Sequence, residues 1–263
     1  MASPADGPPP RIEIAERAHP GGVVAHLTVH NERKLNTLTR ELMSQFVAAV
    51  EALAGRDDLR ALVLRGGGDN AFIGGANILE MAALDRASAE GYIRLVHRTC
   101  ACLRELPVPV IARIDGFALG AGLEVAVSCD LRIATTRAKF GMPEVKVGIP
   151  SVVEAALIPG LIGWGRAREL LMLGEIIDAE TALRWGLVER AVAPGALDAE
   201  IDKVLAALLA AGPNALRLQK QLMREWENLP VEEAIAAGID AFVRAFETDE
   251  PKRMLSAFVA RKR

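Results

Sequence analysis

The sequence predicts an α/β fold in which a partly parallel sheet is covered by helices. Short apolar runs alternate with stretches of helical periodicity over about the first 190 residues. Glycine-rich turns join the two kinds of segment, and the remainder is rich in alanine and leucine at helical spacing. Strands that alternate with helices favour an α/β class with at least part of the sheet parallel.

The first elements are two short strands, a helix and a third strand. Arg11–Ile14 and Gly22–Val29 are expected as strands, the second because apolar residues alternate with less apolar ones. A helix follows Thr39 and ends near Gly55, since apolar residues recur every three or four positions between them. Residues 59–64 form an apolar run that ends at three glycines, which predicts a buried strand and then a loop.

A similar unit follows in the next third of the chain. Residues 109–114 are expected as a strand and 116–122 as a turn of small residues. Residues 123–129 are expected as a buried helix and 131–135 as another strand. This repetition of strand, turn and helix supports the α/β class.

From Pro159 onward strand signals vanish, and glycines that follow apolar periodic segments mark the ends of helices. Helices are expected at residues 166–173, 179–185, 197–211, 213–227 and 231–247. The predicted organisation is therefore a disordered leader at 1–10, an α/β core at 11–194 and a helical C-terminal region at 195–263.

Charge and hydropathy exclude several classes of partner. The 263 residues include 31 Lys and Arg against 34 Asp and Glu, which gives a net charge of −3. Without clustered excess cation there is no general attraction to nucleic acid or to anionic membranes. The longest apolar stretch, residues 117–129, is too short to span a membrane and contains Glu124. We therefore expect neither nucleic acid nor a membrane as a partner.

Cysteine, histidine and the first ten residues predict a reduced, metal-free protein of the cytoplasm. Cys100, Cys102 and Cys129 are too few for a disulfide framework and lack the C-x-x-C spacing, so buried thiols are expected. The four histidines form no H-x-x-x-H pair, and no metal site is expected. The opening MASPADGPPP has neither the basic nor the apolar part of a signal peptide.

Two glycine-rich turns, residues 71–77 and 116–122, are candidates for binding. Each precedes the start of a helix, where the first N–H groups have no partner within the helix. Two such turns facing one point would hold the oxygen of a carbonyl that is becoming an enolate. The alternative is that small residues only allow strand and helix to pack tightly. A dinucleotide fingerprint is discounted because Val125 stands where G-x-G-x-x-G requires glycine.

Two carboxylates follow the second turn. Glu124 lies among apolar helical residues, and Glu144 follows a strand beside a proline. Burial raises the pKa of a carboxyl toward the range useful for proton transfer. The alternative for either glutamate is an ion pair with Arg113 or Arg132. Taken together, two backbone donors and two carboxylates that share a proton and a water are what addition of water to a carbonyl-conjugated double bond requires.

These residues resemble the signature segments of the enoyl-CoA hydratase/isomerase (crotonase) superfamily. The similarity runs from about residue 12 to 262, and its motifs stand in the expected order. The matching segments are 71–78 (A-F-x-x-G-A-D-[IL]), 116–126 (G-x-A-x-G-G-G-x-E-[LV]-A), 140–144 (F-G-x-P-E), 31–38 (N-R-P-x-x-x-N-A-L) and 182–188 (A-x-x-x-G-L-V). The resemblance implies a spiral of ββα units followed by helices that assemble trimers or dimers of trimers.

The resemblance also implies catalytic roles. The backbone N–H groups of Ala76 and Ala121 would form the oxyanion hole for a thioester carbonyl. Glu144 would deliver a proton to Cα, while Glu124 orients the attacking water and helps to deprotonate it. The implied substrate is an acyl-CoA thioester, and no cofactor is implied apart from the coenzyme A that is part of this substrate.

Substrate contacts are implied in three places. Lys34 and Leu35 would touch the adenine-nucleotide end of CoA, and Phe258 and Arg261 of a neighbouring subunit would cover it. Within the two turns, the contact residues would be Gly75, Asn77, Ile78 and Gly120. Pocket depth would depend on the segment 78–92.

The sequence departs from the family pattern at three places. Asn77 replaces an aspartate, and Ala121 replaces a glycine. Alanine retains the backbone N–H, and the cost of the replacement should be small if the φ of Ala121 is negative. Val153 and Glu154 replace a Gly-Gly pair, which would narrow or recharge the acyl pocket. The expected function is an enoyl-CoA hydratase. The alternatives are an enoyl-CoA isomerase, a CoA-thioester hydrolase with Glu154 as an additional acid, and a non-catalytic scaffold.

Overall fold

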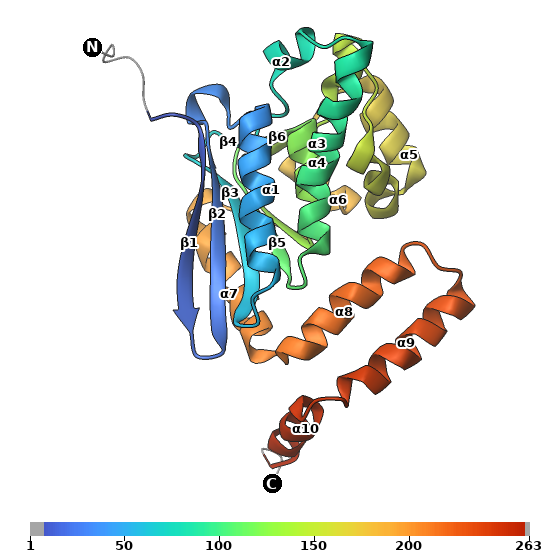
Figure 1. Cartoon of the computed structure of the whole chain (residues 1–263). Coiled ribbons are helices and arrows are strands. Elements are labelled where there is room, and N and C mark those ends of the chain that lie inside the picture. Colours follow the sequence, from blue (N-terminus) through green and yellow to red (C-terminus); the bar gives the residue numbers. More distant parts are fainter. Residues whose placement is uncertain (1–7, 261–263) are drawn as a thin grey trace.

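The computed structural model describes residues 8–260 and shows the predicted α/β fold. Two sheets are surrounded by helices, and the last helices extend away from the main body (Figure 1). Most of the segment 1–10, predicted to be a disordered leader, lies outside the described residues, as does Arg261.

The main sheet has six strands in the order β1-β2-β3-β5-β7-β10. β1 and β2 form an antiparallel hairpin, and the remaining neighbours are parallel. The strands are β1 (Arg11–His19), β2 (Gly22–His30), β3 (Leu59–Gly66), β5 (Val110–Ile114), β7 (Leu131–Thr135) and β10 (Arg190–Val192).

The second sheet has four strands in the order β4-β6-β8-β9, with only β8 and β9 antiparallel. These strands are β4 (Ala71–Ile73), β6 (Phe117–Leu119), β8 (Lys139–Gly141) and β9 (Ile176–Asp178). From β3 to β8, successive strands alternate between the two sheets. This alternation is the spiral of ββα units that the family resemblance implied.

Both faces of the main sheet are covered. Leu62 and Leu64 of β3 join the core beneath α1 (Arg40–Ala54) and α3 (Arg86–Glu105). Ala61 and Val63 point the other way and pack with α7 (Leu197–Ala210). Because successive side chains of a strand point to opposite faces, a strand covered on both sides has no polar alternation. This explains why residues 59–64 form a continuous apolar run.

The remaining helices surround the second sheet or follow the core. α2 (Ile78–Ala82), α4 (Ala121–Val127), α5 (Ile158–Leu173) and α6 (Ala179–Trp185) belong to the main body. The last three are α8 (Pro213–Trp226), α9 (Val231–Ala245) and α10 (Glu250–Ala260), which we call the C-terminal arm. α9 packs along α8, and the arm projects from the body in orange and red (Figure 1).

The sequence predictions were wrong or incomplete in several elements. β4 and β6 lie within the segments 71–77 and 116–122, which were expected as turns, and α5 begins at Ile158 rather than at residue 166. Two strands, β9 and β10, occur after residue 159, where none was expected. Each has three residues and is defined by its pairing with a distant strand, β8 or β7, rather than by a local pattern. α3 and α10 were not predicted either. α3 begins with a capping box formed by Asp85 and Ser88, a local signal that the sequence does contain.

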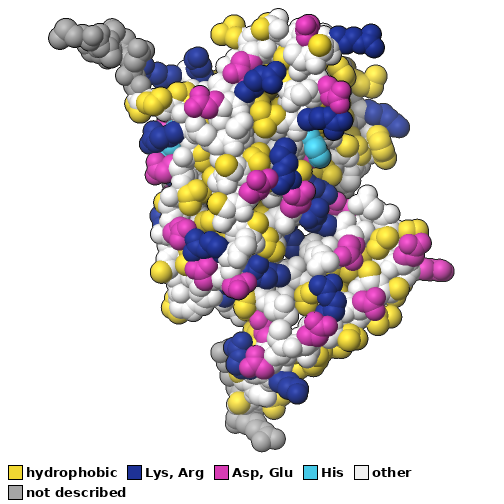
Figure 2. Space-filling view, in the orientation of Figure 1, with side chains coloured by type: hydrophobic (Ala, Val, Ile, Leu, Met, Phe, Trp, Pro, Cys, Tyr) yellow, Lys and Arg dark blue, Asp and Glu magenta, His cyan; other side chains and the backbone are white. Residues whose placement is uncertain are grey.

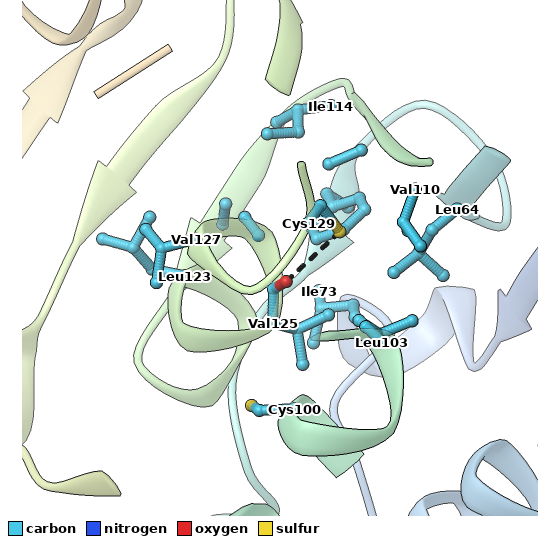
Figure 3. Packing of buried hydrophobic residues seen from close by; sticks show 14 of the residues in the cluster. Leu64, Ile73, Cys100, Leu103, Val110, Ile114, Leu123, Val125, Val127 and Cys129 are labelled. Atoms are coloured by element: carbon cyan, nitrogen blue, oxygen red, sulfur yellow. Dashed lines mark hydrogen bonds between the residues drawn. The ribbon is translucent and has the colours of Figure 1, made fainter. Parts of the chain in front are cut away.

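All seven residues of α4 are buried. Figure 3 shows Val125 of this helix beside Ile73 and Leu103, which come from other elements, while Leu123 and Val127 lie on the other side of the helix. The three cysteines are buried free thiols, as predicted. None of the helices described is long and apolar enough to cross a membrane.

Candidate active site

The two glycine-rich turns lie side by side because the strands before them are neighbours. β4 and β6 pair in parallel, so both chains leave the second sheet at the same edge. The fit is tight: a Cβ on Gly122 would overlap the carbonyl oxygen of Ile73. A glycine is therefore required where the second turn enters α4, and this close approach brings the two turns together.

Each turn presents a backbone N–H that no other group in the described chain uses. Leu38 forms a bridge with the first turn, donating to the carbonyl of Gly75 and accepting from the N–H of Asn77. These two bonds leave the N–H of Ala76 without an acceptor. Ala121 is the first residue of α4, so its N–H has no helical partner. Its φ is not positive, so the alanine fits without strain.

Glu124 lies one helical turn after Ala121 and is 4% exposed. The alternative of an ion pair with arginine is excluded. Arg113 binds Asp198, and Arg132 binds Glu189. Burial, and then the carboxylates of Glu144 and Glu154, raise the pKa of Glu124 to about 8, although the backbone N–H of Ala155 opposes the shift. At neutral pH Glu124 therefore holds a proton.

Glu144 is placed by the turn η2 (Pro143–Val147), which follows β8. Because β8 pairs with β6, this turn lies beside Gly120, which donates its N–H to the carbonyl of Gly141 at 2.9 Å. Gly120 has φ +52°, and a Cβ there would lie 2.6 Å from Oε1 of Glu144. The hydroxyl of Ser151 donates to Oε2 of Glu144 at 2.8 Å. The carboxyl is therefore held from two sides.

Both glutamates and both turns open into one cavity of about 840 Å³. Seven of the residues expected at the site line it, namely Gly75, Ala76, Ile78, Gly120, Ala121, Glu124 and Glu144. Most of the remaining wall is apolar and includes Met81, Leu84, Ile93, Val96, Ile149 and Val152. The segment 78–92 forms part of this wall, as expected.

The other expected contact residues lie outside the cavity lining. Lys34 and Leu35 lie in the short turn η1 (Glu32–Lys34) and at its end, where the carbonyl of Leu35 accepts from the N–H of Gly74 at 2.7 Å. Asn77 caps α2, since its side chain accepts from the N–H groups of Leu79 and Glu80. Phe258 is exposed on α10 in the C-terminal arm.

Sequence reasoning missed two parts of the site and placed a third wrongly. Ser151 was not assigned a role, although it lies only seven residues after the glutamate that it binds. The wall from α3, including Tyr92 and Val96, was missed together with the helix. Neither Val153 nor Glu154 lines the cavity, so the expectation that the two residues narrow or recharge the acyl pocket by lining it is wrong. Glu154 lies behind the wall and binds His97 instead.

A second hollow, of about 890 Å³, lies between α3 and the C-terminal arm. Several charged groups around it already have partners. Arg104 binds Glu227, and Lys220 binds Asp130 and two backbone carbonyls. Neither candidate glutamate lies there. Across residues 8–260, no cluster of His, Cys, Asp and Glu has the arrangement of a metal site.

Comparison with known proteins finds the same family by its sequence profile and by individual relatives. The profile of the family described as enoyl-CoA hydratase/isomerase matches residues 20–263. The chain is 34% identical over 241 residues to a crotonyl-CoA hydratase of Syntrophomonas wolfei, covering 91% of this chain and 93% of that protein. It is 32% identical over 243 residues to a short-chain-enoyl-CoA hydratase of Clostridium acetobutylicum, with coverage of 92% and 93%.

Comparison of structures leads to the same kind of protein. The crystal structure of an enoyl-CoA hydratase from Bacillus anthracis superposes with a TM-score of 0.90 at 28% sequence identity. The match covers 95% of this chain and 96% of that one. Sequence and fold thus agree over nearly the whole length of the chain.

Proposed function

The chain belongs to the enoyl-CoA hydratase/isomerase (crotonase) superfamily, and from this membership we propose that it is an enoyl-CoA hydratase. It would add water syn across the double bond of a 2-enoyl-CoA thioester and give a 3-hydroxyacyl-CoA. One observation carries the proposal: Glu124 and Glu144 open into the same cavity as the turns with the unused N–H groups of Ala76 and Ala121. Two relatives of this chain are named as hydratases of short-chain enoyl-CoA or crotonyl-CoA, which supports the proposal.

The two N–H groups would act on the thioester carbonyl. When the oxygen of water bonds to Cβ, negative charge develops on the carbonyl oxygen as the enolate forms. Donors that are already fixed and have no other partner stabilise this charge without reorganising. Ala76 is held by the bridge to Leu38 and Ala121 by the start of α4, so both donors are rigid.

The two glutamates would move the protons. Glu144 gives a proton to Cα, and Glu124 orients the water and takes its proton as the oxygen bonds to Cβ. The pair begins and ends with one proton. The proton that Glu124 holds before the reaction would first pass through the bound water to Glu144, which leaves Glu124 ionised and able to take a proton from that water. The proton therefore returns to Glu124, and the water supplies, in net, both the hydroxyl and the hydrogen of the product. Ser151 keeps the carboxyl of Glu144 in place through the cycle. Because the wall is mainly apolar, we assign an uncharged acyl group to the substrate.

We also propose a homo-oligomer, either a trimer or a dimer of trimers. α9 exposes an apolar stripe at helical spacing, formed by Val231, Ile235, Ile239, Phe242 and Phe246. An exposed stripe of this kind marks an interaction surface. In this assembly Phe258 and Arg261 of one subunit would cover the adenine end of CoA bound beside Lys34 and Leu35 of another. The three buried thiols support a reducing compartment, the cytoplasm.

The direct test is the loss of conjugated-enoyl absorbance from crotonyl-CoA, measured in parallel with a thiol reagent. A hydratase removes the conjugation and releases no free thiol. Release of thiol would contradict the proposal and indicate hydrolysis of the thioester. If no enoyl-CoA of any chain length is turned over, the proposal fails and a non-catalytic scaffold remains.

A further inference from the structure

A buried carboxylate lies behind Glu124 without lining the cavity. Glu154 is 6% exposed and belongs to the turn η3 (Val153–Leu157). This turn packs against α4, which carries Glu124, and against α3, which carries His97. Oε1 of Glu154 lies 2.7 Å from Nδ1 of His97. Oε2 is fully buried and has no hydrogen-bonding partner among residues 8–260.

This arrangement lowers the stability of the fold, because a buried carboxylate oxygen without a partner loses its hydration. A cost of this kind suggests that the carboxylate has a function. The side chain of His97 is 56% exposed, so the Glu154–His97 pair runs from the protein surface to the back of Glu124. Neither member of the pair lines the cavity. Any influence on the reaction must therefore pass through Glu124 rather than through direct contact with substrate.

The groups around the Glu154–His97 pair determine whether Glu154 is ionised. His97, Cys100 and Arg104 approach from α3, while Glu124 lies on α4. Burial raises the pKa of Glu154, and the charge and hydrogen bond of His97 oppose the rise. His97 therefore favours the ionised form of Glu154.

The backbone before Glu154 is unusual. Val153 has φ +42°, in the left-handed region that β-branched residues avoid. Residues persist in such conformations only where the surrounding structure fixes them, and these positions cluster at functional sites. The position stands where the family pattern has glycine, which adopts this conformation freely. The packing of η3 against α3 and α4 therefore holds Val153 in this conformation, directly before the residue that binds His97.

We propose that Glu154, held by His97, is a positioning residue that sets how firmly Glu124 keeps its proton, an inference that rests on the proposed hydratase function. An ionised Glu154 behind Glu124 makes loss of the Glu124 proton unfavourable by like-charge repulsion. The Glu124–Glu144 pair then keeps its single proton to higher pH than two carboxyls would alone. The range of pH over which the site is active extends upward.

The test measures Glu124 directly. The chain is labelled with ¹³C-carboxyl glutamate, and the Glu124 signal is assigned by its absence in Glu124→Gln. Glu154→Gln should lower the titration midpoint of Glu124 from about 8 by about one pH unit. His97→Gln should lower it by less, because Glu154 then ionises less readily. The double variant should shift no further than Glu154→Gln alone, since both changes act through one group.

The matched control is Glu51→Gln, which removes a carboxylate that binds Arg98 on the outer side of α3. It should leave the midpoint of Glu124 unchanged. The upper limb of the pH profile of kcat/KM with crotonyl-CoA should move down with the midpoint in the Glu154 and His97 variants. A purely structural pair would alter stability without moving this limb.

Three outcomes decide the question. An unchanged Glu124 midpoint in a folded Glu154→Gln variant would overturn the proposal. If that variant does not fold, His97→Gln keeps the carboxylate, and an unchanged midpoint there overturns it equally. The NMR titration needs no turnover. A shifted midpoint in a chain that hydrates no enoyl-CoA of any chain length would therefore retain the coupling and reject the hydratase function instead.

Discussion

The core and the C-terminal arm use their apolar residues in opposite ways. Both faces of β3 are buried, and α1 places five apolar side chains beneath the protein surface. α9 has no buried residue, and Phe242 on its stripe is 67% exposed. Figure 2 shows hydrophobic side chains in yellow along the arm at the lower right of the molecule.

The difference indicates that a single chain forms the whole cavity but leaves an apolar surface of the arm exposed. The cavity, both N–H donors and both glutamates come from elements that precede residue 160. The arm contributes no residue to this cavity. Chemistry should therefore depend on the core of each chain, and assembly on the arm. The following predictions test this separation, from the largest expected effect to the smallest.

The largest effect is expected in the core. Glu144→Gln removes the proposed proton donor to Cα and should lower the rate of crotonyl-CoA hydration by about 10²–10⁴-fold. CoA-thioester binding and the sedimentation coefficient should not change. Glu175→Gln is the control, because this exposed glutamate binds Lys146 and does not line the cavity. Full activity in Glu144→Gln would remove the proposed mechanism.

The corresponding change in the arm is Phe242→Glu. A charge in the centre of the α9 stripe should prevent docking of another copy. The mass measured by sedimentation should then fall toward the 28.1 kDa of one chain. Asp240→Ala, on the polar side of the same helix, should leave the mass unchanged. If Phe242→Glu unfolds the core instead, arm and core are not separable.

The stability of the core is expected to depend on pH through Glu124. The pKa of Glu124 is about 8 in the folded protein against an ordinary value of 4.5, so folding takes up a proton between these values. Stability from this group is complete below pH 4.5 and is lost as pH rises to 8. Glu124→Gln has no such loss. Its advantage in unfolding free energy should grow by about 1.4 kcal/mol per pH unit from pH 5 to 8. A constant difference across that range, measured by denaturant titration, would contradict the shift.

The smallest effect is expected from Ser151→Ala. The variant loses one hydrogen bond to Oε2 of Glu144 and leaves the carboxyl held only by its packing. Because the lost bond is the one that directs Oε2 of Glu144, kcat should fall by roughly tenfold. The melting temperature should fall by only a few degrees, since a single hydrogen bond contributes about 0.5–1.5 kcal/mol to stability. Ser151→Thr should restore part of the rate. An unaltered kcat would show that Ser151 does not position Glu144.

Much of the fold could be predicted because its signals are local. The apolar run at residues 59–64 reports a strand covered on both faces, and α6 spans the residues that were expected. Glu124 was singled out because a carboxylate stood among apolar helical residues, and the structure confirms its burial.

The rest depends on contacts between distant segments. β9 and β10 are too short to have a pattern of their own and exist through their partners. His97 and Glu154 are 57 residues apart, and nothing in either neighbourhood indicates that they meet. Ser151 is near Glu144 in sequence, but the direction of its hydroxyl is set by the turn between them. Such pairings arise from tertiary packing rather than from propensity.

Folding of this chain is expected to be slow because its main sheet is largely parallel. β5 pairs with β3, and β7 with β5, only after the chain has passed through a strand of the second sheet. The entropy of closing these long loops is lost before the contacts compensate for it. Within the main sheet only the β1–β2 pair is an antiparallel hairpin closed by a short turn, so order can begin there at the lowest cost. Stopped-flow refolding should be slower than for a helical bundle of equal length. Until β3 arrives, β2 presents an open edge to other nascent chains.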